Sequence, residues 1–170
     1  MLKISAMVFL VTAFALAGKW ASSVQERRVK VMGEIMLMLN IVESQLRHSH
    51  LPVTDLLRVL CNNAGLSELE FIKTCRERVC FGEPFPEAWK NSVEAEISLC
   101  RLLPESVGNL TAFGADIGVT DLESQLSGCE YYKQIFSGEL EMQREKSMKY
   151  KKLFPPLGLL LGISAAIMIL

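Results

Sequence analysis

Apolar residues recur at helical spacing through most of the chain. Between residues 24 and 48 they lie three or four positions apart, which places them on one face of an α-helix. So broad a face is typical of a central helix that several others contact. The face consists of Val24, Val31, Met32, Ile35, Met38, Leu39, Val42 and Leu46. Long alternating runs of β-branched residues are absent, so the pattern predicts an all-α domain.

Prolines and glycines divide the middle of the chain into four shorter segments with a helical pattern. The apolar positions predict helices over about residues 53–60, 69–79, 87–93 and 107–117. Ser67 and Glu70 have the spacing of a capping box, which would begin the second of these helices. Gly118 would end the fourth in a left-handed conformation, which glycine adopts without strain.

The last third of the chain, from Thr120 to Leu170, predicts one long amphipathic helix. Thr120 would cap its start, and Glu123 would complete a second capping box. Asp121 would lie in the first turn, where its negative charge suits the helix dipole. The apolar stripe consists of Leu122, Leu126, Cys129, Phe136 and Leu140. Gly118, Thr120 and Asp121 therefore form a predicted structural junction between two helices.

The composition of this helix changes sharply near its end. A basic cluster precedes an uncharged stretch, Leu153 to Leu170, whose length of about 18 residues just crosses the hydrocarbon core of a bilayer. The cluster consists of Arg144, Lys146, Lys149, Lys151 and Lys152. Because such clusters stay on the cytoplasmic side of a span, we expect the preceding domain in the cytoplasm.

A second uncharged stretch lies near the start of the sequence, from Ile4 to Gly18. It is either a membrane anchor or a signal peptide with the small-residue cleavage pattern Ala15-Leu16-Ala17. Its length of about 15 residues favours a signal peptide. The basic residues that follow it favour an anchor whose downstream side is cytoplasmic, and we take the anchor as the main interpretation.

These features predict an all-α protein, a compact bundle of about six helices between an N-terminal and a C-terminal transmembrane helix. The predicted segments are 1–21 (N-terminal transmembrane segment), 22–152 (cytoplasmic helical domain) and 153–170 (C-terminal transmembrane segment). The aqueous part is long enough for one domain with its own core. The predicted location is the cell membrane, with the soluble domain in the cytoplasm.

The C-terminal span carries a face of small residues. Gly158, Gly162 and Ala166 repeat every four positions, which lets another helix approach closely. Ala13 and Ala17 offer a similar face on the first segment. We predict that Gly158, Gly162 and Ala166 form a membrane packing face.

Few residues offer chemistry. The net charge of −1 gives no global field that would recruit nucleic acid. The odd number of cysteines along helical segments indicates buried reduced thiols, and they are Cys61, Cys75, Cys80, Cys100 and Cys129. His48 and His50 lie at a helix end without a C-x-x-C partner motif, so we expect them to be solvated. We therefore predict no metal, no cofactor, no small-molecule substrate and no catalytic residue.

Several short stretches occur in an order and spacing typical of one protein family. They are residues 110–114, residues 117–121 followed by Gln125, Gly82 followed by Glu87-Ala88-Trp89, and the ending Tyr150-Lys151-Lys152-Leu153 with Leu157-Gly158 and Gly162. Together they resemble the stage III sporulation protein AB family over essentially the whole chain. The Pro155-Pro156 pair departs from the pattern of that family.

The resemblance implies a role in the channel between mother cell and engulfed forespore of endospore-forming bacteria. The helical domain of this family is similar to cytoplasmic domains of the platform protein of type II secretion and type IV pilus systems. This implies a non-enzymatic platform subunit in the mother-cell membrane that couples a cytoplasmic secretion-type ATPase to other membrane subunits. The family brings no catalytic residues with it.

Two other interpretations remain open. The alternative function is an extracytoplasmic helical domain with a cleaved signal peptide and a C-terminal membrane anchor, which the odd cysteine count and the basic flanks oppose. A small helical hydrolase with a Cys or His nucleophile would need a polar cleft, and the pattern shows no such cleft.

Overall fold

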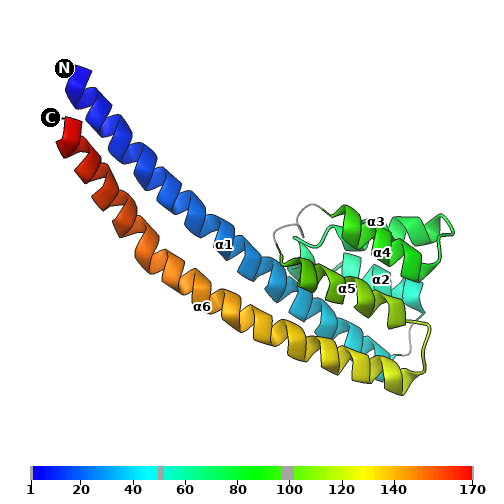
Figure 1. Ribbon diagram of the computed structural model, residues 1–170. Helices are drawn as coiled ribbons and strands as arrows, with labels where there is room; N and C mark the ends of the chain where they lie inside the picture. The colour runs from blue at the N-terminus through cyan, green and yellow to red at the C-terminus, as the bar shows by residue number, and fades with distance from the viewer. Residues whose placement is uncertain (1, 50–51, 97–101, 170) are drawn as a thin grey trace. The chain divides into compact units, whose positions relative to one another are not determined.

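The computed structural model describes residues 2–49, 52–96 and 102–169, and all of its secondary structure over these ranges is helical (Figure 1). The elements are α1 (Leu2–His48), α2 (Val53–Cys61), the 3₁₀ helix η1 (Ala64–Leu66), α3 (Phe71–Cys80), α4 (Phe85–Ala95), α5 (Pro104–Asp116) and α6 (Leu122–Ile169). Side chains are described between residues 23 and 153 within those ranges, and in the terminal parts at Thr12, Pro156, Leu160 and Ser164. The predicted all-α class is confirmed.

The chain forms two compact units, which we call the body and the stem. The body is Lys30–Leu140, and the stem combines Met1–Val29 with Glu141–Leu170. Because α1 and α6 are each one long helix, both contribute residues to both units. This division does not test the predicted segments 1–21, 22–152 and 153–170, which concern where a membrane begins.

The core of the body follows the predicted apolar faces. Every residue of the first face from Val31 to Leu46 is buried, and each large apolar side chain buried in this way stabilises a fold by about 1.5–3 kcal/mol. On α6, Cys129, Phe136 and Leu140 are buried, whereas Leu122 is exposed because the helix only begins there. The two long helices therefore supply the framework against which the shorter helices pack.

The short helices of the body pack in chain order, α2 with α3, α3 with α4 and α4 with α5. Proline starts three of them, because it fixes φ near the helical value and lacks the N–H that a first turn leaves unbonded. Pro52 precedes α2, Pro84 precedes α4, and Pro104 is the first residue of α5. Short connections of this kind keep consecutive helices adjacent.

The predicted capping box of Ser67 and Glu70 is wrong. Helix α3 begins at Phe71, and Glu70 makes no side-chain hydrogen bond to its first turn. The Ser67 hydroxyl instead donates to the carboxylate of Glu34 on α1, at 3.4 Å. A charged carboxylate is a stronger hydrogen-bond acceptor than the neutral groups near Ser67. Ser67 therefore bonds to Glu34 of α1 and does not cap α3.

Within the stem, the two helical segments lie side by side and run antiparallel (Figure 1). Gln25 Nε2 donates to Gln143 Oε1 at 2.6 Å, and both side chains are buried. Next to this pair along α1, Glu26 Oε1 lies 3.0 Å from Lys151 Nζ of α6. One buried amide pair and one ion pair thus join the two segments where their side chains are described.

Among the described residues, no helix is both long enough and apolar enough to cross a membrane. The segments 1–21 and 153–170 fall mostly on side chains outside the described part, so their membrane assignment stays a prediction. The same holds for the packing face of Gly158, Gly162 and Ala166, whose contacts lie outside the described residues.

Candidate functional site

The predicted junction between α5 and α6 is a tight turn closed by one glutamine. Gly118 has a φ of 78°, the left-handed conformation expected from the sequence. The Gln125 side-chain amide holds the turn at two points, because its Oε1 accepts from Gly118 N at 3.2 Å and its Nε2 donates to Thr120 O at 2.6 Å. Gln125 is buried, and a buried amide needs hydrogen-bond partners. These two backbone groups provide them.

The helix cap at this junction is Asp121, and the prediction of Thr120 as the cap is wrong. The Asp121 carboxylate accepts from the Ser124 N–H at 3.1 Å and from the Ser124 hydroxyl at 2.6 Å. The Ser124 hydroxyl and its N–H lower the pKa of Asp121, because they favour the charged form. The Thr120 hydroxyl turns back and donates to Asp116 O at the end of α5, at 3.2 Å.

Gly118→Val should destabilise the body by about 2 kcal/mol, since a β-branched residue with positive φ is strained. A Cβ at this position would also lie 2.7 Å from Val53 Cγ2 on α2. The measurement is the urea midpoint of the full chain in mild detergent, followed by circular dichroism. Gly128→Ala on α6 is the control, because a Cβ there meets nothing within 4 Å. An unchanged midpoint for Gly118→Val would contradict the left-handed turn.

Two of the stretches that carry the family resemblance meet at Trp89 of α4. The buried indole N–H donates to Leu110 O of α5 at 2.8 Å. The indole ring makes edge contacts with Phe71 and Phe113, at centroid distances of 5.1 and 6.1 Å. Gly114 of α5 lies directly against the ring, where a Cβ would come within 2.0 Å of it. These residues therefore form the packing centre of α3, α4 and α5.

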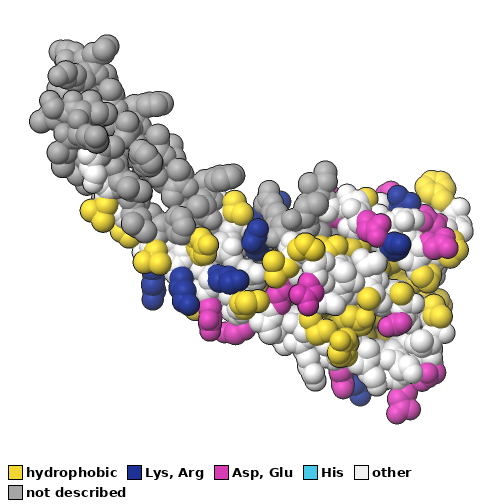
Figure 2. Space-filling view, viewed as in Figure 1, with side chains coloured by type: hydrophobic (Ala, Val, Ile, Leu, Met, Phe, Trp, Pro, Cys, Tyr) yellow, Lys and Arg dark blue, Asp and Glu magenta, His cyan; other side chains and the backbone are white. Residues whose placement is uncertain are grey.

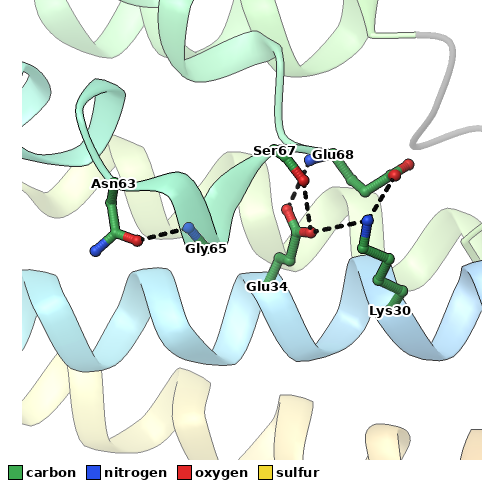
Figure 3. A network of polar contacts seen from close by, with 6 residues as sticks. All are labelled: Lys30, Glu34, Asn63, Gly65, Ser67 and Glu68. Carbon is green, nitrogen blue, oxygen red and sulfur yellow. Dashed lines mark hydrogen bonds and ion pairs between the residues drawn. The ribbon is translucent and has the colours of Figure 1, made fainter.

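A buried carboxylate that the sequence pattern did not single out holds the loop before α3. Glu34 Oε2 accepts from the Glu68 backbone N–H at 2.7 Å, and Glu34 Oε1 accepts from Ser67 Oγ (Figure 3). Lys30 lies 3.8 Å from the same carboxylate and 2.9 Å from the carboxylate of Glu68. Asn63 accepts from Gly65 N at 2.8 Å and shapes η1 next to it. The network ties α1 to the chain between α2 and α3.

A second polar contact joins α1 to α6 within the body. Lys133 Nζ lies 2.6 Å from Glu43 Oε2, and Arg47 lies 2.9 Å from Glu43 Oε1. The hydrogen bond from Lys133, followed by that from Arg47, lowers the pKa of Glu43. Burial of the carboxylate opposes this effect without reversing it. Glu43 therefore stays charged and links the two long helices.

The Glu43–Lys133 pair should make stability depend on pH. Because the pKa of Glu43 is lower when folded, the pair stabilises the fold above the unfolded-state pKa of about 4.3, and this is lost as pH falls through the folded pKa. Lys133→Met should lower the free energy of unfolding by about 1 kcal/mol at neutral pH and by less in acid. Urea unfolding at several pH values measures this, with Arg58→Met at an exposed pair as control. A pH-independent loss would mean that Lys133 acts through packing.

The cysteines only partly match the prediction of buried thiols. None of the four described cysteines is in a disulfide. Burial raises the pKa of Cys75 to about 12 and that of Cys129 to about 11, so both are neutral thiols. Cys61 is half-buried, and Cys80 is exposed, which corrects the prediction for this residue. Cys80 is five positions after Cys75 on α3 and therefore faces away from the core, while Cys100 lies outside the described residues.

The residues weighed for metal binding show no cluster in the described part of the chain. His48 is exposed at the end of α1, and His50 lies outside the described residues. Over the described ranges, no group of three or more His, Cys, Asp or Glu side chains could hold a metal ion. The polar side chains described above instead bond to backbone groups or to one another.

The comparisons with known proteins identify a family. A family model described as stage III sporulation protein AB matches residues 3–170. No curated protein and no solved structure shows significant similarity to the chain. The match includes the junction at Gly118, the Trp89 contacts and both segments of the stem.

Proposed function

The chain belongs to the stage III sporulation protein AB family, and from this premise we propose that it acts as a non-enzymatic membrane platform subunit. In this role the stem anchors the protein in the mother-cell membrane, and the body lies in the cytoplasm. The body binds a cytoplasmic secretion-type ATPase and couples it to the other membrane subunits of the channel between mother cell and forespore.

The observation that carries this proposal is the match over essentially the whole chain, which includes both terminal segments. The stem supports it, because α1 begins and α6 ends at the same end of an antiparallel helix pair (Figure 1). An antiparallel pair of helices suits an anchor that crosses a bilayer twice. The basic residues from Arg144 to Lys152 then lie where the positive-inside rule expects them.

The contacts inside the body support a non-enzymatic role. Its buried polar side chains make structural hydrogen bonds. Glu34 accepts from a loop N–H, and Gln125 bonds to two backbone groups of a turn. A catalytic group instead needs a free atom facing substrate and a matched acid or base partner. The family resemblance brings no such residues.

Co-purification tests the platform role. We expect the tagged full chain, extracted in mild detergent from sporulating cells, to retain the secretion-type ATPase and the other membrane subunits of the channel. A chain that retains the membrane subunits but not the ATPase would contradict the coupling role.

The exposed thiol of Cys80 tests the topology in the same cells. A membrane-impermeant maleimide added outside intact cells should leave Cys80 unlabelled, and permeabilisation should allow its labelling. The Cys80→Ser chain identifies the signal that belongs to this residue. Labelling from outside would instead support the alternative, an extracytoplasmic domain with a cleaved signal peptide and a C-terminal anchor.

A further inference from the structure

Phe81, at the turn between α3 and α4, exposes its ring to solvent on a backbone held by hydrogen bonds. Its N–H bonds to Glu77 O and Arg78 O at 3.0 and 3.1 Å, which closes the last turn of α3. Gly82 follows with a φ of 94° and directs the chain away. Yet the Phe81 side chain is 92% exposed, more than any other large apolar side chain among the described residues. Burying a phenylalanine side chain is favourable by about 1.5–3 kcal/mol. The fold does not gain this free energy at Phe81, and a partner that covers the ring would gain it on binding.

The exposed ring borders a groove between α2 and α3, which we call the Phe81 groove. The groove has a volume of about 500 Å³, which is ample for side chains of a bound segment. Its lining consists of Cys61, Asn62, Lys73, Arg76, Glu77, Cys80 and Phe81. Figure 2 shows that hydrophobic, basic and acidic side chains lie next to one another on the face of the body that is in view. The groove therefore offers an apolar wall beside charged side chains.

The charges of the groove favour an acidic partner. Two cations, Lys73 and Arg76, line it against one carboxylate, Glu77. Two other arginines of α2 and α3 are already paired, since Arg58 lies 2.9 Å from Asp55 and Arg78 lies 3.1 Å from Glu83. Among the described residues, neither Lys73 nor Arg76 forms an ion pair. Arg76 hydrogen-bonds the Cys61 thiol, but a guanidinium has five N–H donors. Lys73 and Arg76 can therefore both pair with carboxylates from another molecule, and such pairs steer association as well as strengthen it.

We propose that the Phe81 groove binds an acidic segment of the cytoplasmic ATPase, with an apolar side chain of that segment against Phe81 and its carboxylates beside Lys73 and Arg76. The inference rests on the proposed function and adds the surface through which it works. Aromatic residues and arginine are the side chains that most often dominate binding energy at protein interfaces.

Two variants test the groove in the full chain, in mild detergent, with the purified ATPase as the probe. Phe81→Ser and Arg76→Glu should each weaken binding about tenfold or more, as expected for residues at the centre of an interface. Tyr131→Ser and Lys90→Glu are matched controls, because they make the same kinds of change at side chains that are each 59% exposed on other helices. The controls should bind within about twofold of the original chain.

The results separate this inference from the function on which it rests. If the unaltered chain does not bind the ATPase, the proposed function fails and the inference with it. If Phe81→Ser and Arg76→Glu bind like the unaltered chain, the inference alone is overturned. Equal loss in Lys90→Glu overturns it too, because general surface charge would then explain the binding. Circular dichroism melting shows whether each variant is folded, and both groove substitutions are at exposed positions.

Cys80 gives a second readout that needs no substitution at Phe81 or Arg76. In a Cys61→Ser, Cys100→Ser chain, the rate at which maleimide modifies Cys80 should fall at least fivefold when saturating ATPase is added. An unchanged rate would overturn the inference, because Cys80 lines the groove. Vesicles containing anionic lipid should give no such protection, and protection by vesicles alone would assign the groove to a membrane surface instead.

Discussion

Gly114→Ala should lower the free energy of unfolding of the body by about 3 kcal/mol, the upper end of the cost of overpacking. The new Cβ would lie 2.0 Å from Trp89 Cδ1 and 2.3 Å from Cγ and Nε1. The ring cannot easily yield, because Phe71 and Phe113 contact it and its N–H is bonded to Leu110 O. Urea unfolding of the full chain, followed by circular dichroism, measures the loss.

The matched control is Gly108→Ala on the same helix. A Cβ at residue 108 meets nothing within 4 Å. Alanine has a higher helix propensity than glycine, so this substitution should raise stability by up to about 1 kcal/mol. The two glycine-to-alanine changes on α5 should thus have opposite signs. If both substitutions changed the stability in the same direction, the contact with Trp89 would not explain the effect of Gly114→Ala.

Glu34→Ala is expected to lower the free energy of unfolding by about 2 kcal/mol, because it removes hydrogen bonds to a charged acceptor and leaves a backbone donor unpaired. The donor is the Glu68 N–H, now 2.7 Å from the Glu34 carboxylate. Hydrogen exchange provides a local readout, since the Glu68 amide should lose protection before the core amides of α1 do.

Glu34→Gln separates the charge from the hydrogen bond. Its amide oxygen can still accept from the Glu68 N–H, so we expect roughly half the loss of the alanine variant. Glu94→Ala on α4 is the surface control, because that side chain is exposed and its contact with Lys90 is 4.0 Å long. Equal stability of Glu34→Ala and the unaltered chain would mean that the loop is held by its own turn and not by α1.

The helices could be predicted because their signals are local. The spacing of Val31, Ile35 and Val42 already defines a buried face, and Pro104 and Gly118 mark the ends of the segment that becomes α5. The cap of α6 was misplaced by one residue, since Thr120 and Asp121 can both cap a helix. The carbonyl of Asp116 decides between them by accepting the Thr120 hydroxyl, and only the folded turn brings it there.

The contacts that the sequence did not reveal come from residues far apart along it. Glu34 bonds to a loop more than thirty positions later, which is why the Ser67–Glu70 pattern gave the wrong cap. The Phe81 groove exists only because the end of α2 lies beside α3. Spacing on α3 separates Cys75 from Cys80, but which of the two faces the core depends on the packing of neighbouring helices.

The buried amide pair of Gln25 and Gln143 limits how the stem can move. Sliding one helix past the other by a turn, about 5.4 Å, would separate the two buried amides. Each unpaired amide would then cost about 1–3 kcal/mol, much as a single polar pair fixes the register of a coiled coil. The pair therefore fixes the register of the two stem helices, so a force along one helix is transmitted to the other.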